Sequence, residues 1–318
     1  MIRSFAGVVA AALAFALPPV FAQAWPKATI NVVVPLAAGD GGDTTARAMG
    51  ELLSRELDTP VVVVNKPGAG GALGVQSVIA AKKDGYTVLF TQNSPLTIRR
   101  VLEPAAANYD PLRELVPLAI TTRTPSVLVV RKDAPFHTFQ DMVAYAKKNP
   151  GKVRIGNAGP GSAGDLSVTL INAAAGTDMT SIPYKGAAPA VTDVIGGQVE
   201  GVILALGAVA AHMKAGTLKA VAISSPFPEL PEVPTLTRLG YKQDILGVWF
   251  GWMLPAGTPA EVAQVLLPAL QKAARDPAIA GRLLPLGIVQ EWEPANRLSA
   301  EITREFDTVS QVNSRLRK

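Results

Sequence analysis

Short apolar runs alternate along the chain with longer segments whose apolar residues recur at helical spacing. Residues 30–34, 61–64 and 86–90 have the length and composition of buried strands. Between the first two runs, the apolar residues from Met49 to Leu57 follow the spacing of an amphipathic helix. This alternation predicts α/β layers built around a mostly parallel sheet.

The same pattern starts again in the middle of the chain. Residues 127–130 form another apolar run, and a helix over 138–148 and a strand near 153–155 are expected after it. A glycine-rich turn then leads into a helix from about Ala163, and residues 220–224 have the composition of a further strand. These segments predict a second α/β unit.

The last two predicted helices, over residues 259–275 and 298–315, need a core to cover, and the economical solution returns them to the first unit. The fold class is therefore α/β, with two doubly wound domains of which the first is discontinuous. Two crossover strands, near residues 121–130 and 247–254, would join the domains and act as a hinge. The predicted domains are residues 25–123 with 248–318, and residues 124–247.

Residues 1–24 have the layout of a secretory signal. A lone Arg3 precedes an apolar run from Phe5 to Leu17, two prolines interrupt it, and small residues precede a cut after Ala24. We predict a cleavable signal peptide and a mature protein that works in the periplasm. An uncleaved anchor is disfavoured, because the prolines interrupt the run before the ~20 residues that a spanning helix needs.

The composition narrows the classes of function. The formal net charge is +5 and the basic residues are scattered, so no nucleic-acid partner is expected. The chain has no cysteine, which excludes disulfides and a lipid-modified N-terminal cysteine. Its two histidines, His137 and His212, do not have metal-ligand spacing, so we expect neither a metal nor a cofactor. The mature protein is expected to be a monomer.

Two glycine-rich turns, over residues 37–44 and 156–164, stand where a predicted strand leads into a helix. Each would expose unpaired backbone N–H groups and the positive end of a helix dipole, which together suit an anion. Glycines that merely permit sharp turns are the alternative, but two such turns at equivalent points favour one shared ligand. Asp43 is expected to cap the first helix, and Ser162 with Asp165 has capping-box spacing.

Other chemistries lack a required residue. Thr44 stands where a dinucleotide fingerprint needs its third glycine, and Ser162 stands where a phosphate loop needs lysine. Pro160 occupies the first glycine position of a nucleophile elbow. An exported esterase that uses Ser162 stays an alternative, although no motif places a histidine to activate it.

Several ordered motifs resemble the Bug-type extracytoplasmic receptors of tripartite tricarboxylate transporters along nearly the full chain. The matching stretches are Val34-Pro35 with the first glycine turn and residues 43–47, residues 65–71, 84–87, 145–151, 183–190 with Asp193 and 196–199, and 249–251 with 255–259. The resemblance implies a fold like that of type II periplasmic binding proteins. It also implies two domains that close on a small, usually carboxylated molecule, with no catalysis and with delivery to an integral-membrane transporter.

Carried over by position, the resemblance implies ligand contacts from both domains. Asp193 matches a recurrent family aspartate, which either contacts the ligand or fixes the loop before it. The implied ligand-binding residues are Ala38, Gly39, Asp40, Gly41, Gly42, Asp43, Thr44, Gln92, Asn93, Ser94, Ala158, Gly159, Gly161, Ser162, Ala163, Gly164, Lys185, Gly186, Ala187, Ala188 and Asp193.

The chain departs from the family pattern at positions that bear on the ligand. Leu204 falls where many members carry an aspartate suited to an ammonium group, which argues against an amino acid. Asp40 and Asp165 would each repel a carboxylate if they faced the cleft. The identity of the ligand therefore stays undecided. A role as the sensing subunit of a membrane signalling system also stays an alternative, because a sensor would use the same closed receptor.

Overall fold

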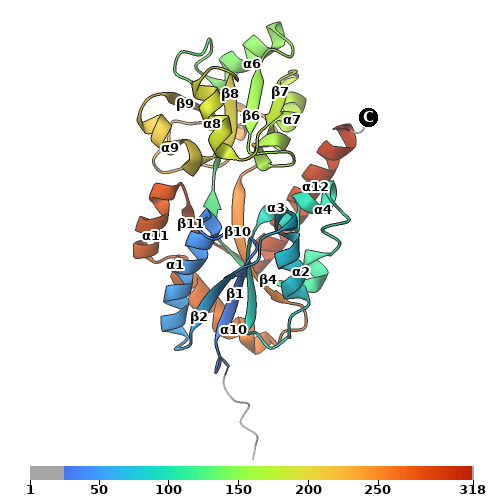
Figure 1. Cartoon of the computed structure of the whole chain (residues 1–318), viewed down its shortest axis with the longest axis vertical. Helices are drawn as coiled ribbons and strands as arrows, with labels where there is room; N and C mark the ends of the chain where they lie inside the picture. The colour runs from blue at the N-terminus through green and yellow to red at the C-terminus, as the bar shows by residue number, and fades with distance from the viewer. Residues whose placement is uncertain (1–24, 317–318) are drawn as a thin grey trace, which may run out of the picture.

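The structure is a computed structural model that describes residues 25–316. The predicted signal peptide and its cleavage site lie outside these residues. The chain forms two α/β lobes, one above the other in Figure 1, each built on its own sheet. Lobe 1 contains the elements within residues 30–124 and 248–316, and lobe 2 contains those within residues 126–223.

Lobe 1 is built on a six-stranded sheet with the order β11-β4-β10-β3-β1-β2. The first three strands of the chain are parallel, whereas β10 runs antiparallel to both of its neighbours. The strands are β1 (Ile30–Val34), β2 (Val61–Asn65), β3 (Thr87–Gln92), β4 (Leu115–Thr124), β10 (Val248–Pro255) and β11 (Val289–Pro294).

Lobe 2 is built on a five-stranded sheet with the order β7-β6-β8-β5-β9. Its strands are β5 (Ser126–Arg131), β6 (Arg154–Asn157), β7 (Thr180–Pro183), β8 (Gly201–Ala205) and β9 (Leu218–Ile223). Strands β6, β7 and β8 are parallel to one another, and β5 runs against them.

Helices cover both sheets. The helices of lobe 1 are α1 (Gly41–Glu56), α2 (Ala72–Ile79), α3 (Asn93–Leu96), α4 (Ile98–Leu102), α5 (Pro111–Glu114), α10 (Ala260–Ala273), α11 (Pro277–Leu283) and α12 (Ala295–Leu316), with the short turns η1 (Ala69–Gly71) and η3 (Leu284–Leu286). The helices of lobe 2 are α6 (Phe139–Lys148), α7 (Ala163–Ala175), α8 (Ala187–Ile195) and α9 (Leu206–Lys214). The turn η2 (Thr237–Leu239) lies on the return path to lobe 1. No helix among the described residues has the length and apolar character to cross a bilayer.

Strand directions place the ends of both sheets opposite one another. Strand β4 leads through Pro125 into β5, and β1, β2 and β3 run in the same direction as β4, so their carboxyl ends face lobe 2. Strands β6, β7 and β8 run against β5 and therefore end facing lobe 1. The turns that follow these strands thus line two facing edges, which is where ligands bind in open α/β sheets.

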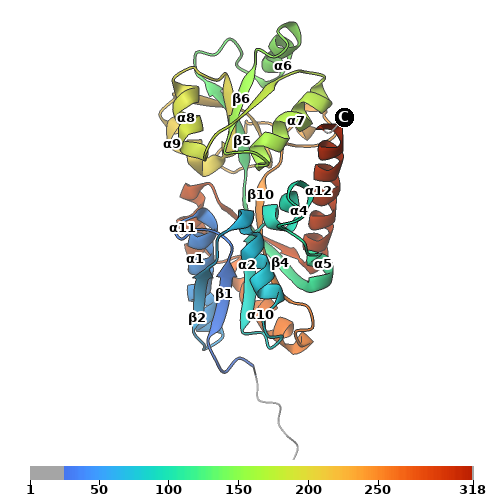
Figure 2. The same ribbon diagram turned by 45° about the vertical axis from the view of Figure 1, so that its right-hand side comes forward.

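Two connections and one helix join the lobes. The chain passes up through β4 and β5 and returns through residues 224–247 into β10, as Figures 1 and 2 show. Helix α12 runs along the side of lobe 1 and reaches α7 of lobe 2, where Val309 and Val312 pack with Leu166 and Leu170. The α/β fold class is confirmed, and the domain boundaries and hinge stay predictions.

Aromatic side chains fill the centre of lobe 1. The rings of Phe90 and Phe250 stack with centroids 5.5 Å apart, and Trp252 packs on Phe90 at 4.6 Å. The buried indole N–H of Trp252 donates to the Thr121 hydroxyl over 2.9 Å, which satisfies the polar atom of this large residue. This core holds β3 and β10 under the facing edge.

Candidate functional site: the facing strand ends

The first glycine turn joins β1 to α1. The helix begins at Gly41, and the Asp40 carboxylate accepts a hydrogen bond from the Gly42 N–H over 2.9 Å. The prediction that Asp43 caps this helix was therefore wrong, because Asp40 occupies the cap and Asp43 lies within the first turn. Residues 37–40 are exposed, so the start of α1 is accessible.

Asp43 holds the first turn from inside. The residue is 3% exposed, and its carboxylate accepts hydrogen bonds from the Gly39 N–H at 2.8 Å, Asn65 Nδ2 at 2.9 Å and Arg47 Nε at 3.0 Å. Burial alone would raise the pKa of Asp43, but the bonds from Arg47, Gly39 and Asn65 outweigh it and keep the pKa below its usual value. The Asp43 carboxylate is therefore fully engaged by groups of its own lobe.

The second glycine turn joins β6 to α7 in the same manner. Ser162 is the N-cap, and its hydroxyl accepts from the Asp165 N–H over 3.2 Å, as the capping-box spacing predicts. The Asp165 carboxylate accepts from the Gly161 N–H at 2.8 Å and from the Ser181 hydroxyl at 2.5 Å. Asp165 is therefore directed toward its own lobe and holds its turn, as Asp43 does.

The glycines of the two turns differ in what they permit. Gly39 and Gly161 have φ angles of +84° and +68°, which favour glycine. Gly42 and Gly164 occupy the same place in the two helices and pack closely on the strands beneath. A Cβ at Gly42 would lie 2.6 Å from the Phe250 ring, and one at Gly164 would overlap the carbonyl oxygen of Ile203.

Residues that the sequence did not indicate flank both turns. The side chain of Leu102 on α4 would lie 2.5 Å from a Cβ at Gly161, so α4 of lobe 1 touches the second turn across the gap. The Ile288 side chain would lie 3.3 Å from a Cβ at Gly41. Leu102 ends the short helix α4 and Ile288 lies between η3 and β11, and no motif signals a contact at either position.

The predicted contacts after β3 lie at the facing edge, but Asn93 is turned inward. Its side chain is 1% exposed, and Nδ2 donates to Glu305 Oε1 at 2.8 Å and to the Gly247 carbonyl at 3.1 Å. Gln92 and Ser94 are each partly exposed. The ligand contacts implied for these three residues stay predictions.

The segment after β7 contains Lys185, whose side chain is exposed, and Tyr184, whose hydroxyl is hydrogen-bonded to Asp193. Lys185 is exposed and forms no ion pair within the described residues. The Tyr184 hydroxyl donates to Asp193 over 2.7 Å, and burial together with this bond raises the pKa of Tyr184 to about 12. Asp193 thus fixes the residue that precedes the loop, and the loop leads through Gly186 to the start of α8, where no side chain caps the helix.

Helices α1, α7 and α8 each begin shortly after a strand that ends at one of the facing edges. The carboxylates of Asp43 and Asp165 are hydrogen-bonded within their own turns. The backbone N–H groups at the helix starts and the Lys185 ammonium contribute positive potential at these edges. Such an arrangement suits a small anion.

Ser162 has no partner that would make it a nucleophile. Its hydroxyl oxygen lies 3.3 Å from Asn157 Oδ1 and caps α7, and no histidine bonds to it within the described residues. His137 lies on the far side of lobe 2, on the rim of a separate cavity. The geometry therefore gives Ser162 a structural role.

Replacing Ser162 with alanine is expected to cost about 1 kcal/mol of stability, the usual value of a helix cap. No ester hydrolysis is expected from either protein. Thermal melting and a p-nitrophenyl acetate assay test both statements. Steady hydrolysis by the wild type that the substitution abolishes would overturn this assignment.

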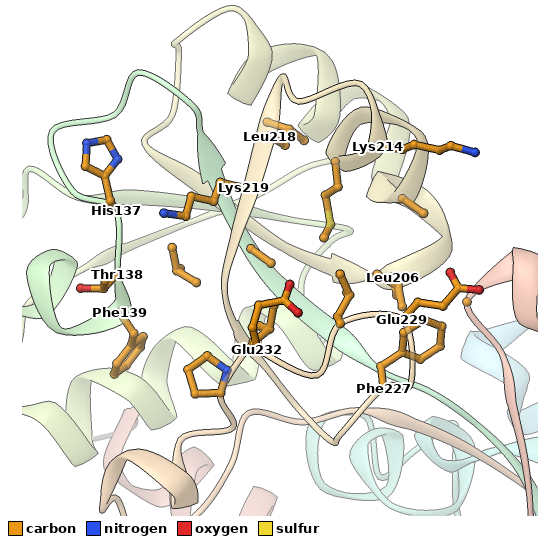
Figure 3. Close-up of a pocket in the computed structure, with 18 of the residues that line it drawn as sticks. His137, Thr138, Phe139, Leu206, Lys214, Leu218, Lys219, Phe227, Glu229 and Glu232 are labelled. Carbon is orange, nitrogen blue, oxygen red and sulfur yellow. The ribbon is translucent and has the colours of Figure 1, made fainter.

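Two cavities lie away from the glycine turns. One of about 1060 Å³ is bounded by α9, β9 and residues of η3. The other, of about 410 Å³, is lined by the return segment, by α12 and by the ends of β4 and β10 that lie nearest lobe 2. In Figure 3, Lys214, Lys219, Glu229 and Glu232 lie apart on the rim of the larger cavity and point in different directions. These groups do not converge as a carboxylate site requires.

Two α/β lobes whose strand ends face each other are the architecture of the periplasmic solute-binding proteins that this chain resembles in structure. The chain matches the tripartite tricarboxylate transporter family receptor over residues 45–310, and it belongs to this family. The resemblance stated from the sequence is thereby confirmed. The family and the fold are those of receptors rather than enzymes, and receptors of this family are periplasmic.

Relatives support the same class. A TctC solute-binding protein from Polaromonas superposes with a TM-score of 0.83 at 29% identity, covering 92% of this chain and 99% of that one. Protein BugT from Bordetella pertussis is 32% identical over 94% of each chain. MatC from Rhodopseudomonas palustris, solved with bound malate, has a TM-score of 0.71 at 28% identity, covering 91% of this chain and 99% of MatC. A second R. palustris protein, solved with adipate, has a TM-score of 0.75 at 26% identity and covers 91% and 97%.

Proposed function

We propose that this protein captures a small carboxylated molecule between its lobes, closes on it and delivers it to a tripartite tricarboxylate-type membrane transporter. The observation that carries the proposal is the pair of equivalent turns that bring the starts of α1 and α7 to the facing edges. The bound malate and adipate of two neighbours support a carboxylate as the class of ligand. The signal peptide predicted over residues 1–24 is consistent with export.

The positions of Asp43 and Asp165 are compatible with an acidic ligand. Asp165 would repel a carboxylate if it faced the gap, but it is bonded to Gly161 and Ser181. Asp43 is paired with Arg47 at 2.9 Å. Of these three aspartates, Asp40 is the one whose side chain is exposed, at the start of α1, where it accepts the Gly42 N–H.

The available contacts are sufficient for useful affinity. A micromolar complex requires about 8 kcal/mol of net binding free energy. Hydrogen bonds to a charged group contribute about 1.5–3 kcal/mol each, and a partly buried helix end contributes up to about 2 kcal/mol. Four or five such contacts, less the cost of ordering the ligand, reach this value without an arginine clamp.

A thermal-shift screen of the mature protein against mono-, di- and tricarboxylates tests the proposal. Ligand at a hundred times its Kd stabilises the folded state by about 2.7 kcal/mol, which raises the midpoint by roughly 5 °C or more. Neutral amide analogues of each acid serve as matched controls. If no acid raises the midpoint of folded protein, the proposed ligand class is wrong.

Replacing Gly161 with valine is expected to weaken binding of the acid that gives the largest thermal shift by at least about tenfold. The side chain would occupy the approach to α7, meet Leu102 and strain a residue whose φ is +68°. Calorimetric titration and melting on the same variant separate lost affinity from lost stability.

Gly216 gives a matched control for backbone strain. Its φ is +71°, a Cβ there would meet no atom within 4 Å, and it follows α9 at the end away from the facing edge. Gly216→Val should therefore lose stability and keep its affinity. Equal affinities for the Gly161 and Gly216 variants would show that the second turn does not contact the ligand.

A further inference from the structure

Glu305 is a buried carboxyl group at which three elements of lobe 1 meet. It lies on α12 and is 5% exposed. Its Oε1 accepts from Asn93 Nδ2 and lies 2.8 Å from the Thr97 hydroxyl, and its Oε2 accepts from Trp249 Nε1 at 2.9 Å. No lysine, arginine or histidine pairs with it in the described part of the chain.

The three partners of Glu305 belong to parts with different roles. Asn93 begins the segment after β3, at the edge that faces lobe 2, and Thr97 joins α3 to α4. Trp249 lies on β10, the strand by which the chain returns from lobe 2. The Asn93 amide also donates to the Gly247 carbonyl, directly before β10. One carboxylate therefore ties the facing edge to a crossing strand.

Helix α12 extends this connection to the other lobe. Within two turns after Glu305, Val309 and Val312 pack against Leu166 and Leu170 of α7, the helix that begins at the second glycine turn. Ile98 of α4 belongs to the same cluster. A shift of α12 would thus move contacts at both edges.

The hydrogen-bond donors around position 305 explain why a carboxyl group is found there. Asn93 Nδ2 and Trp249 Nε1 can only donate, so the group between them must accept on both sides. A glutamine would present its own N–H₂ to one of these donors, and turning Asn93 to compensate would lose the bond to Gly247. Burial without a cation raises the pKa of Glu305, and the bonds from Asn93, Thr97 and Trp249 act against this shift. The geometry of these bonds is therefore what makes the buried carboxyl group tolerable here.

We infer that Glu305 is a positioning residue that sets the relative orientation of the lobes by fixing Asn93, β10 and α12 to one another. The inference rests on the proposed function for its meaning in ligand capture, but it concerns the free protein as well. Weakening this junction should let the lobes sample other angles and should lower affinity, because closure would have to select one of them.

Spin-label distances test this in the mature protein. The chain has no cysteine, so Arg55→Cys on α1 and Thr192→Cys on α8 provide two unique, exposed labelling sites on the two lobes. Pulsed electron–electron double resonance is recorded for this pair alone and with Glu305→Gln. We expect the glutamine variant to show a shifted or broadened distance distribution without ligand, and an affinity for malate or adipate reduced by at least about tenfold.

Glu301→Gln is the matched control. Glu301 lies one turn earlier on the same helix and bonds to Arg304 at 2.5 Å, while Arg123, 3.7 Å away, keeps Glu291 and Glu293. This variant should keep the wild-type distribution. A shift equal to that of Glu305→Gln would assign the effect to α12 in general and overturn the inference.

Two milder variants keep the inference testable if Glu305→Gln does not fold. Thr97→Val removes one hydroxyl from the facing-edge side, and Trp249→Phe removes the indole N–H from the β10 side. Each should broaden the distribution in part, and wild-type distributions in all folded variants would overturn the inference. If wild-type protein binds neither malate nor adipate, these two acids are excluded as ligands, and the ligand-free distributions still decide the role of Glu305.

Discussion

Replacing Asp43 with asparagine is expected to lower the free energy of unfolding by about 3 kcal/mol. The buried carboxylate accepts from the Gly39 N–H, from Asn65 and from Arg47, and an amide in its place would direct a donor at one of these donors. The turn before α1 would lose its internal support. Chemical denaturation at neutral pH measures the loss.

Asp40 provides the control for this substitution. It lies three residues earlier, is exposed, and caps α1 through one bond to the Gly42 N–H. Asparagine caps helices about as well as aspartate, so Asp40→Asn should change stability by less than about 0.5 kcal/mol. An equal loss in both variants would contradict the special role of Asp43.

The pH dependence of the Asp43 contribution has a defined sign. Its pKa is lowered in the folded state, so the stability that it provides is present above the unfolded pKa and is lost as the pH falls through the folded pKa. The difference in stability between wild type and Asp43→Asn should therefore shrink on acidification from neutral pH to below about 4. A difference that grows on acidification would contradict the lowered pKa.

Replacing Gly164 with alanine is expected to destabilise the protein by about 3 kcal/mol or to prevent folding. The added Cβ would overlap the backbone carbonyl oxygen of Ile203, and it would lie 3.0 Å from the Cβ of Asn157. Neither atom can turn away as a side-chain end can, so α7 must move off β8. Denaturation of the soluble fraction, together with its yield, measures the effect.

Gly42 is the matched position in lobe 1. A Cβ there would meet the side chains of Leu36 and Phe250, at 2.5 and 2.6 Å. Because side chains can repack, Gly42→Ala should cost less than Gly164→Ala. The opposite order would contradict the packing described at the two helix starts.

The alternation of strands and helices could be predicted from the sequence because each unit carries its own periodicity. The capping role of Ser162 followed from its spacing to Asp165 alone. The start of α1 did not, because Asp40 and Asp43 are both good caps and two glycines between them are poor helix formers. In the structure Asp40 is the cap and Gly42 packs against Phe250, a contact between residues far apart in the chain that the local sequence does not signal.

Contacts between distant residues account for what the sequence could not predict. Asn93 and Glu305 are separated by 212 positions, and the inward orientation of Asn93 depends on the bond between them. The apolar residues that flank the glycine turns, Leu102 and Ile288, have no local signal. Leu102 approaches Gly161 across the lobes, and Ile288 approaches Gly41 from a distant part of the same lobe. Motif spacing thus located the edges but not the direction of each side chain on them.

A crystal structure of the mature protein with the acid that gives the largest thermal shift tests the central claim most directly. The account predicts a carboxylate group between the lobes, with its oxygens within hydrogen-bond distance of backbone N–H groups at the starts of α1 and α7. An acid bound in the 1060 Å³ cavity beside α9 instead, with both glycine turns free of ligand, would contradict it.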